Sequence, residues 1–259
     1  MNEAMTPIEV QDLTLAYGDF TLVRDLHFTV RRGDIFIVMG GSGCGKSTLL
    51  RALMGLKPPV KGAVRYGGTD LWHCTEDERQ RLLRNIGVLF QGGALWTSMT
   101  LAENVALPLS RYTTLSDEEI YEHACLKLSL VGLAGFEEYY PAEISGGMRK
   151  RAGLARALAL DPQIVLFDEP SAGLDPVSSR NLDELILQLR ESLDMTFVVV
   201  THELASIFAI GSNAVFLNSE TRRADGFGDP KELLRTTNSP HVKNFLTRGA
   251  PGQGDRHVA

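Results

Sequence analysis

Residues Gly40-Gly41-Ser42-Gly43-Cys44-Gly45-Lys46-Ser47 follow a short apolar segment, Asp34 to Met39, and precede an apolar helical segment, Lys46 to about Met54. They fit the pattern G-x-x-x-x-G-K-[ST] in the strand–turn–helix context that makes this pattern specific. Glycines let the backbone curl so that successive N–H groups point at phosphate oxygens, and the following helix N-terminus adds positive partial charge. The stretch, extended to Thr48, therefore predicts a nucleoside triphosphate site with Lys46 at the β- and γ-phosphates.

An acidic pair follows a second apolar segment, as the other half of such a site requires. Ile164 to Phe167 predicts a buried strand, and Asp168-Glu169 follows it directly. Mg²⁺ prefers oxygen ligands and keeps part of its water shell, so Ser47 and Asp168 are its predicted ligands, Asp168 through water. Glu169 is placed to polarise a water for attack on the γ-phosphate. An acidic pair alone would be read as a helix cap, and the glycine-rich loop is what favours the magnesium site.

Other apolar segments alternate with helical ones along the chain. Two of them, Ile8 to Leu15 and Leu22 to Val30, surround Tyr17-Gly18-Asp19 and predict an antiparallel hairpin. Helical spacing of leucines predicts a helix over Ser178 to Ser192. Further strands are predicted over Ile86 to Phe90, Ile164 to Phe167, Thr196 to Val200 and Ala214 to Asn218. This alternation predicts an α/β fold with a largely parallel sheet covered on both faces.

The middle of the chain has helical patterns and no convincing strand. Ser116 with Glu119 is a capping box, which predicts a helix start there. We therefore predict a helical subdomain over 92–160, inserted into an α/β core formed by 1–91 and 161–246. A short helix is expected over Lys231 to Arg235, and a flexible polar tail over 247–259.

Composition and charge restrict the partners that we expect. The 259 residues include 26 basic and 32 acidic side chains, a net charge of −6. Proteins that bind nucleic acid need a basic face to neutralise phosphates, so no nucleic-acid partner is expected. The three cysteines, Cys44, Cys74 and Cys125, share no metal-binding spacing and are expected to be reduced thiols.

The apolar runs of the chain are short, such as Ile35 to Met39 and Phe197 to Val200. A helix that crosses a bilayer needs about 20 apolar residues. Met1 to Gln11 lacks the basic start and apolar stretch of a signal peptide. We expect a cytoplasmic chain whose role at a membrane depends on partner proteins.

A third motif narrows the family. Ile144-Ser145-Gly146-Gly147-Met148-Arg149-Lys150-Arg151 resembles the signature sequence of ABC (ATP-binding cassette) ATPases, and Ala152 to Leu160 continues it as an amphipathic helix. Ser145, Gly146 and Gly147 at a helix N-terminus form an anion site. In that family the site closes over the γ-phosphate held by the glycine-rich loop of a second protomer. Met148 departs from the family pattern, in which glutamine is usual.

Other family elements follow in order over Ile8 to Leu246, which implies a P-loop NTPase cassette with a RecA-like core. Tyr17 resembles the aromatic that stacks on adenine, with a place in the hairpin core as the alternative. Gln91 matches the glutamine that joins Mg²⁺ and the attacking water to the helical subdomain. Ser171 to Asp175 resembles the loop that communicates across the dimer, and His202 matches the switch histidine that contacts the γ-phosphate.

Two segments resemble a subgroup, the Mla-type ATPases that serve transporters with MCE-domain partners. They are Phe90 to Thr100, with Gly92-Gly93-Ala94 where many importers have proline, and Glu103 to Leu109; Ser239 to Leu246 is similar to the end of the same group. The resemblance implies an ATPase that drives phospholipid transport and maintains outer-membrane lipid asymmetry. It also implies a second copy of the chain, permease subunits, a small STAS-domain partner and a place on the cytoplasmic face of the inner membrane.

Two alternatives stay open at this point. One is the ATPase of an importer or exporter for another substrate. The other is an ABC protein of DNA repair or translation, a class that normally shows tandem cassettes, a coiled-coil insertion or zinc cysteines.

Overall fold

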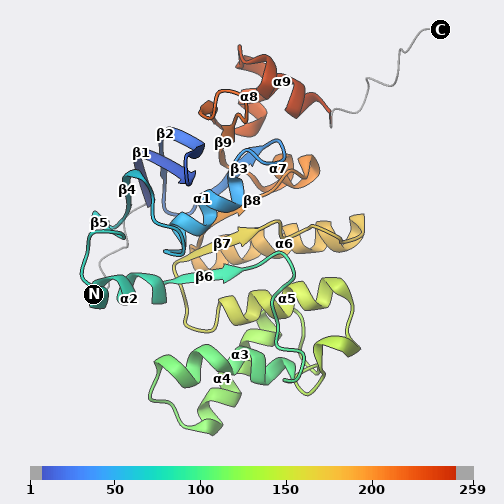
Figure 1. The fold of residues 1–259 in the computed structure, drawn as a ribbon. Coiled ribbons are helices and arrows are strands. Elements are labelled where there is room, and N and C mark those ends of the chain that lie inside the picture. The colour runs from blue at the N-terminus through green and yellow to red at the C-terminus, as the bar shows by residue number, and fades with distance from the viewer. Residues whose placement is uncertain (1–7, 249–259) are drawn as a thin grey trace, which may run out of the picture.

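The computed structural model describes residues 8–248, which form two β-sheets with helices around them (Figure 1). The first sheet is antiparallel, in the order β2-β1-β4-β5. Its strands are β1 (Ile8–Tyr17), β2 (Phe20–Val30), β4 (Lys61–Tyr66) and β5 (Thr69–Asp70). β1 and β2 are the hairpin predicted from the sequence, so that prediction is confirmed.

The second sheet has the order β10-β9-β3-β8-β7-β6 and is parallel except for β10, which runs antiparallel to β9. Its strands are β3 (Ile35–Gly40), β6 (Ile86–Leu89), β7 (Ile164–Asp168), β8 (Thr196–Val200), β9 (Asn213–Leu217) and β10 (Ala224–Gly228). The five predicted strands, including Asp34 to Met39 before the glycine-rich loop, are therefore confirmed within one residue at their ends. The first sheet and the helices leave β3 and β8 with no exposed residue, as expected for strands covered on both faces.

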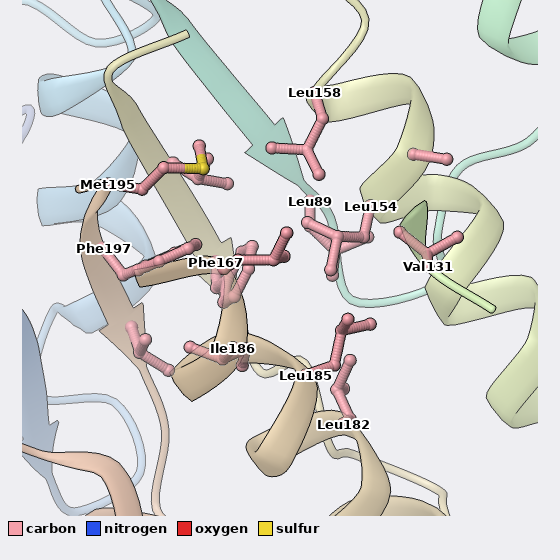
Figure 2. Packing of buried hydrophobic residues seen from close by; sticks show 14 of the residues in the cluster. Leu89, Val131, Leu154, Leu158, Phe167, Leu182, Leu185, Ile186, Met195 and Phe197 are labelled. Carbon is pink, nitrogen blue, oxygen red and sulfur yellow. The ribbon is translucent and has the colours of Figure 1, made fainter. Parts of the chain in front are cut away.

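Successive residues of β3 belong to different hydrophobic cores. Ile35, Ile37 and Met39 pack in the core that contains α5 (Gly146–Ala157) and α6 (Pro176–Leu193). Phe36 and Val38 pack with the antiparallel sheet and α1 (Lys46–Leu53). Figure 2 shows the first core, where the aromatic side chains of β7 and β8 meet leucines of α5 and α6. Packing on both faces of the sheet thus fixes the ends of these strands, where the predicted site residues lie.

Between residues 92 and 160 the chain is helical and contains no strand, as predicted. The helices are α3 (Leu101–Tyr112), α4 (Asp117–Leu130), the 3₁₀ turn η1 (Pro141–Glu143) and α5. The capping box of Ser116 and Glu119 is present, and Thr100 with Glu103 forms a second one at the start of α3. The division of the chain into core and helical subdomain stays a prediction.

Several elements were not predicted, or were predicted with wrong ends. β4, β5, α2 (Glu76–Arg84) and β10 are absent from the sequence prediction, and α5 ends at Ala157, not at Leu160. α7 (Leu204–Ile210) and α9 (Pro240–Thr247) were also not predicted, and α9 extends by one residue, Thr247, into the predicted tail. The short helix predicted over Lys231 to Arg235 is confirmed as α8 (Pro230–Thr236). The rest of that tail, 249–259, lies outside the described residues. Between residues 8 and 248, no helix is both long and apolar enough to span a bilayer.

Candidate nucleotide-binding site

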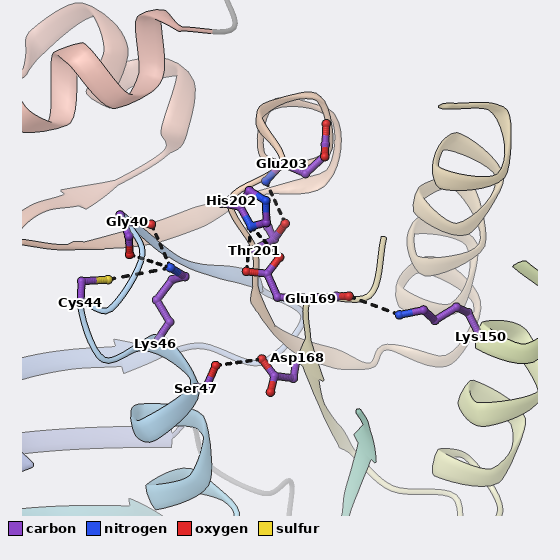
Figure 3. Close-up of polar contacts among 11 residues, drawn as sticks. Gly40, Cys44, Lys46, Ser47, Lys150, Asp168, Glu169, Thr201, His202 and Glu203 are labelled. Carbon is purple, nitrogen blue, oxygen red and sulfur yellow. Dashed lines mark hydrogen bonds and ion pairs between the residues drawn. The ribbon is translucent and has the colours of Figure 1, made fainter. Parts of the chain in front are cut away.

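The glycine-rich loop joins the carboxyl end of β3 to the N-terminus of α1 and wraps around the ammonium group of Lys46. Lys46 Nζ donates hydrogen bonds to the main-chain oxygens of Gly40 and Gly41, both at 2.9 Å (Figure 3). Gly40 has φ +150°, and a Cβ there would lie 2.4 Å from the carbonyl oxygen of Leu217. Gly45, the N-cap of α1, has φ +102°. The curled loop therefore needs glycine at these positions, and it places a cation next to a helix N-terminus.

Ser47 and Asp168 are in contact where α1 passes the end of β7. Ser47 Oγ donates a hydrogen bond to Asp168 Oδ1 at 3.3 Å, which joins α1 to the end of β7. Burial raises the pKa of the Asp168 carboxyl, the Ser47 bond lowers it, and the neighbouring Glu169 raises it further. The negative charge of the Asp168 carboxylate is thus only partly compensated. A hydroxyl oxygen beside a carboxylate is a set of ligands that suits Mg²⁺.

Glu169 and His202 form the next contact. The Nδ1 atom of His202 lies 2.9 Å from the Glu169 carboxylate, whose side chain is 14% exposed. Glu169 has φ +50°, and its N–H donates to the carbonyl of Val200 at the end of β8. A left-handed backbone at a residue with a large side chain is strained. Here it turns the carboxylate out of the line of β7 and toward the imidazole.

Gln91 is linked to this group through its main chain. It lies two residues beyond the end of β6, and its carbonyl oxygen accepts a hydrogen bond from Nζ of Lys150 on α5. Lys150 Nζ also donates to the carbonyl oxygen of Glu169 at 3.4 Å. Lys150 is not among the site residues predicted from the sequence. The signal was its helical spacing from the buried Gly153 and Leu154, which places a lysine on the inward face of α5.

Tyr17 lies at the end of β1 and is 47% exposed. Hydrogen bonds that the Thr48 and Arg51 side chains donate to its phenolic oxygen lower the pKa of Tyr17, which places this oxygen beside α1. Lys57 Nζ lies 4.5 Å from the centre of the Tyr17 ring. The ring is therefore next to the helix that begins in the glycine-rich loop, and part of it is open to a ligand.

The signature residues lie apart from this group. Ser145 is the N-cap of α5 and accepts a hydrogen bond from the N–H of Met148 at 3.2 Å. A Cβ on Gly146 would meet Leu174, just before α6, and a Cβ on Gly147 would meet Ser178 in the first turn of α6. The structure thus pairs Ser47 with Asp168 and Glu169 with His202, and it links the main chains of Gln91 and Glu169 through Lys150. Met148, which lacks the amide usual in the family, packs against the hydrophobic core.

The site thus contains the Lys46 ammonium group in a curled loop. The carboxylates of Asp168 and Glu169 and the imidazole of His202 lie at the carboxyl ends of adjacent parallel strands. Such strand ends are where ligands bind in open α/β sheets. The family model described as ABC transporter matches residues 23–172. The chain belongs to the ABC transporter family. That range contains the loop, the signature residues and the acidic pair of this ABC protein.

Individual relatives cover almost all of the chain. The Escherichia coli K12 protein named intermembrane phospholipid transport system ATP-binding protein MlaF is 35% identical over 245 residues, 95% of this chain and 90% of that protein. The Haemophilus influenzae protein of the same name is 38% identical, over 95% of this chain and 92% of its own length. A Mycobacterium tuberculosis protein, named "probable ribonucleotide transport ATP-binding protein mkl", is 43% identical over 92% of this chain. This chain spans 66% of the length of that mycobacterial relative.

Solved structures share the fold. A dimeric ATP-binding cassette in a post-hydrolysis state with ADP and phosphate has a TM-score of 0.77 and 29% identity, covering 86% of this chain and 98% of the other. The cassette cbiO1 from Clostridium perfringens has a TM-score of 0.80 over 94% of this chain and 95% of its own. Its 23% identity makes it a match of fold alone. The predicted α/β cassette fold, with an antiparallel N-terminal part, is confirmed.

Proposed function

We propose that this chain is the ATP-hydrolysing motor subunit of an ABC transporter that moves phospholipids or similar hydrophobic molecules across the cell envelope. The observation that carries the proposal is a set of three contacts at the carboxyl ends of β3, β7 and β8. Lys46 is held by the glycine-rich loop, Ser47 binds Asp168, and Glu169 binds His202. The substrate class rests on the phospholipid transport named for the two relatives that this chain covers almost completely.

In this proposal each nucleotide residue has a chemical task. The N–H groups of the loop from Gly40 to Thr48 and the charge of Lys46 bind the triphosphate, and Tyr17 packs on the base. Ser47 and Asp168, with the Gln91 side chain, hold Mg²⁺, which when bound neutralises charge on the phosphate oxygens. Glu169 accepts a proton from the attacking water. His202, held by Glu169, donates a hydrogen bond to the γ-phosphate.

Completion of the site requires a second copy of the chain. In the single chain the N-terminus of α5 lies beside Ser178 of α6, and Ser145 caps its own helix. Two cassettes placed head to tail would bring each α5 N-terminus to the triphosphate of the other, where its partial positive charge adds to that of Lys46. The matched solved cassettes described as dimers support this assembly. ATP then stabilises the dimer, and hydrolysis releases it.

A surface groove next to Gln91 is the proposed contact with a membrane subunit. It has a volume of 530 Å³ and lies between α2, β6, α3 and α5, where Phe90 and Tyr112 are 39% and 50% exposed. A helix of a permease fits an apolar groove of this kind, and the β6 strand carries Gln91 to the same place. The proposed partners are permease subunits, an MCE-domain protein and a small STAS-domain protein. The proposed location is the cytoplasmic face of the inner membrane.

The alternative substrate has one specific support, the ribonucleotide transport named for the mycobacterial relative. Copurification separates the two. Phospholipid and permease subunits that accompany the tagged chain support the proposal. Permease subunits without phospholipid, together with stimulation of the ATPase by ribonucleotides, would support the alternative.

The hydrolytic role is tested with Glu169→Gln. This variant keeps a side chain of the same size but lacks a carboxylate that accepts a proton, so turnover should fall by at least about a hundredfold. ATP binding should persist, and the protein should accumulate as a dimer in size-exclusion chromatography with MgATP. Glu184→Gln, which changes an exposed carboxylate of α6, is the matched control and should hydrolyse ATP like the wild type. Undiminished steady-state hydrolysis by Glu169→Gln contradicts the role given to Glu169.

A further inference from the structure

Lys150 is a lysine in the interior of the protein, with 6% of its surface exposed. From α5 it reaches the ends of two neighbouring parallel strands, β6 and β7. Its ammonium group donates hydrogen bonds to the main-chain oxygens of Gln91 and Glu169 (Figure 3, where the contact to Glu169 is drawn). One side chain therefore joins the two loops that carry the proposed magnesium-linked glutamine and the proposed base.

The surroundings of this ammonium group are unusual for a buried cation. Among residues 8–248, no carboxylate lies within ion-pairing distance of Lys150, and its two acceptors are neutral carbonyls. Burial lowers the pKa of Lys150, while the charges of Asp168 and Glu169 raise it. A buried charge without an ion-pair partner is costly, whereas a methionine of similar length would fill the same space without that cost. Packing alone thus does not account for a lysine here.

We propose that Lys150 is a positioning residue for ATP hydrolysis. By holding the carbonyls of Gln91 and Glu169 it fixes the backbone on which both side chains stand, and hence their directions at the γ-phosphate. The inference rests on the proposed ATPase function and adds a residue that belongs to neither the glycine-rich loop nor the acidic strand end.

The place of Lys150 on α5 gives the contact a second consequence. The N-terminus of α5 carries Ser145, the residue proposed to meet the nucleotide of the partner chain. Lys150 lies five residues further along the same helix, about 7.5 Å along its axis at 1.5 Å per residue. A rigid helix that shifts when its N-terminus meets the partner's nucleotide therefore moves the ammonium group that aligns Gln91 and Glu169. Closure of the dimer would then align the hydrolytic residues of the chain that supplies the signature.

The test compares three variants in the full chain. Lys150→Met removes both hydrogen bonds at similar length, and Lys150→Arg keeps a cation that reaches two acceptors. Lys127→Met is the matched control, because Lys127 is also 6% exposed and lies on α4, where it pairs with Asp161. Steady-state ATPase assays give kcat and KM, calorimetry with a non-hydrolysable ATP analogue gives affinity, and thermal unfolding measures the stability that each variant loses.

Lys150→Met is expected to lower kcat by at least about tenfold with the KM for ATP and the analogue affinity changed by less than about threefold. Lys150→Arg should recover part of that kcat, and Lys127→Met should stay within about twofold of the wild type. A Lys150→Met protein whose kcat stays within about twofold of the wild type overturns the inference. An equal loss of kcat in Lys127→Met also overturns it, because the loss then follows from stability. A wild-type chain with no ATPase activity at all would instead overturn the proposed function.

Discussion

Replacement of Asp183 by asparagine is expected to stabilise the protein at neutral pH and to have little effect in acid. Asp183 lies on α6, is 7% exposed, and accepts a hydrogen bond from Ser206 Oγ of α7 at 2.8 Å. Burial raises the pKa of Asp183 to about 6 from the ordinary value of 3.8; the Ser206 bond lowers it, and the charge of Glu203 raises it. The folded protein therefore binds this proton more tightly than the unfolded chain does.

The sign and size of the effect follow from this difference. A carboxyl whose pKa is higher in the folded state makes stability fall as pH rises from about 4 to about 6, and the whole cost is present above that range. The rise from 3.8 to about 6 is roughly two pKa units, and each unit corresponds to about 1.4 kcal/mol. The ionised Asp183 thus costs up to about 3 kcal/mol above pH 6. Asparagine carries no charge, and its carbonyl still accepts the Ser206 hydrogen bond, so we expect a gain of about 1 to 3 kcal/mol.

Urea unfolding of the wild type and Asp183→Asn at about pH 8 and about pH 4.5 measures this gain. The difference in the free energy of unfolding between the two proteins should be largest at the higher pH and should shrink toward the lower one. Other titrating groups cancel because both proteins carry them. Glu184→Gln, one residue along α6 and exposed, should show no such pH dependence. An Asp183→Asn protein that is less stable at pH 8, or a gain of the same size at both pH values, refutes the reasoning.

Two further predictions concern the glycine-rich loop. Lys46→Ala should weaken ATP binding by at least about tenfold, because it removes the cation that the loop surrounds. Unchanged ATP affinity in calorimetry would contradict the nucleotide-binding role of the loop. Lys61→Ala on β4 is the control. Cys44 is 1% exposed and burial raises the pKa of its thiol, so its alkylation by N-ethylmaleimide should be slow and should become faster as pH rises. Bound MgATP should cover the loop and slow this alkylation. Equal rates of Cys44 labelling with and without MgATP would rule out shielding by the nucleotide, and Cys74, which is partly exposed, serves as the internal reference.

The parts of the fold that were predictable have short-range causes. The run Ile35 to Met39 is apolar at every position, and the structure buries every one of them. Ser116 and Glu119 form their capping box within one helical turn, so the sequence spacing alone identifies it. The glycine-rich loop combines both kinds of signal, an apolar strand before it and a helix after it, and its conformation depends on glycines whose φ values are positive.

The elements that were missed have weaker local signals than these. α2 has no buried residue, so its sequence shows no apolar stripe, and only the Thr75–Glu78 capping box marks its start. β10 is an edge strand with two glycines and no buried position, and it exists because β9 offers it hydrogen bonds. The contact of Lys150 with Gln91 and Glu169 joins three segments far apart in the chain. Sequence spacing marks Lys150 as inward-facing but cannot say which carbonyls it meets.

The charges of the site favour the proposed assembly of two chains around the nucleotide. Lys46 is the cation that the loop surrounds, and it faces the carboxylates of Asp168 and Glu169 across the site. Burial raises the pKa of Asp168 because it removes water from the charged carboxylate, and Glu169 raises it further, although Ser47, Arg51 and Lys46 lower it. A triphosphate adds further negative charge to this place. Lys150 interacts with the charges of Asp168 and Glu169, but its ammonium group donates its hydrogen bonds to main-chain carbonyls and forms no ion pair with either carboxylate. We therefore expect ATP to bind together with a divalent cation and to draw in the α5 N-terminus of a second chain, since both bring positive charge to the place that lacks it.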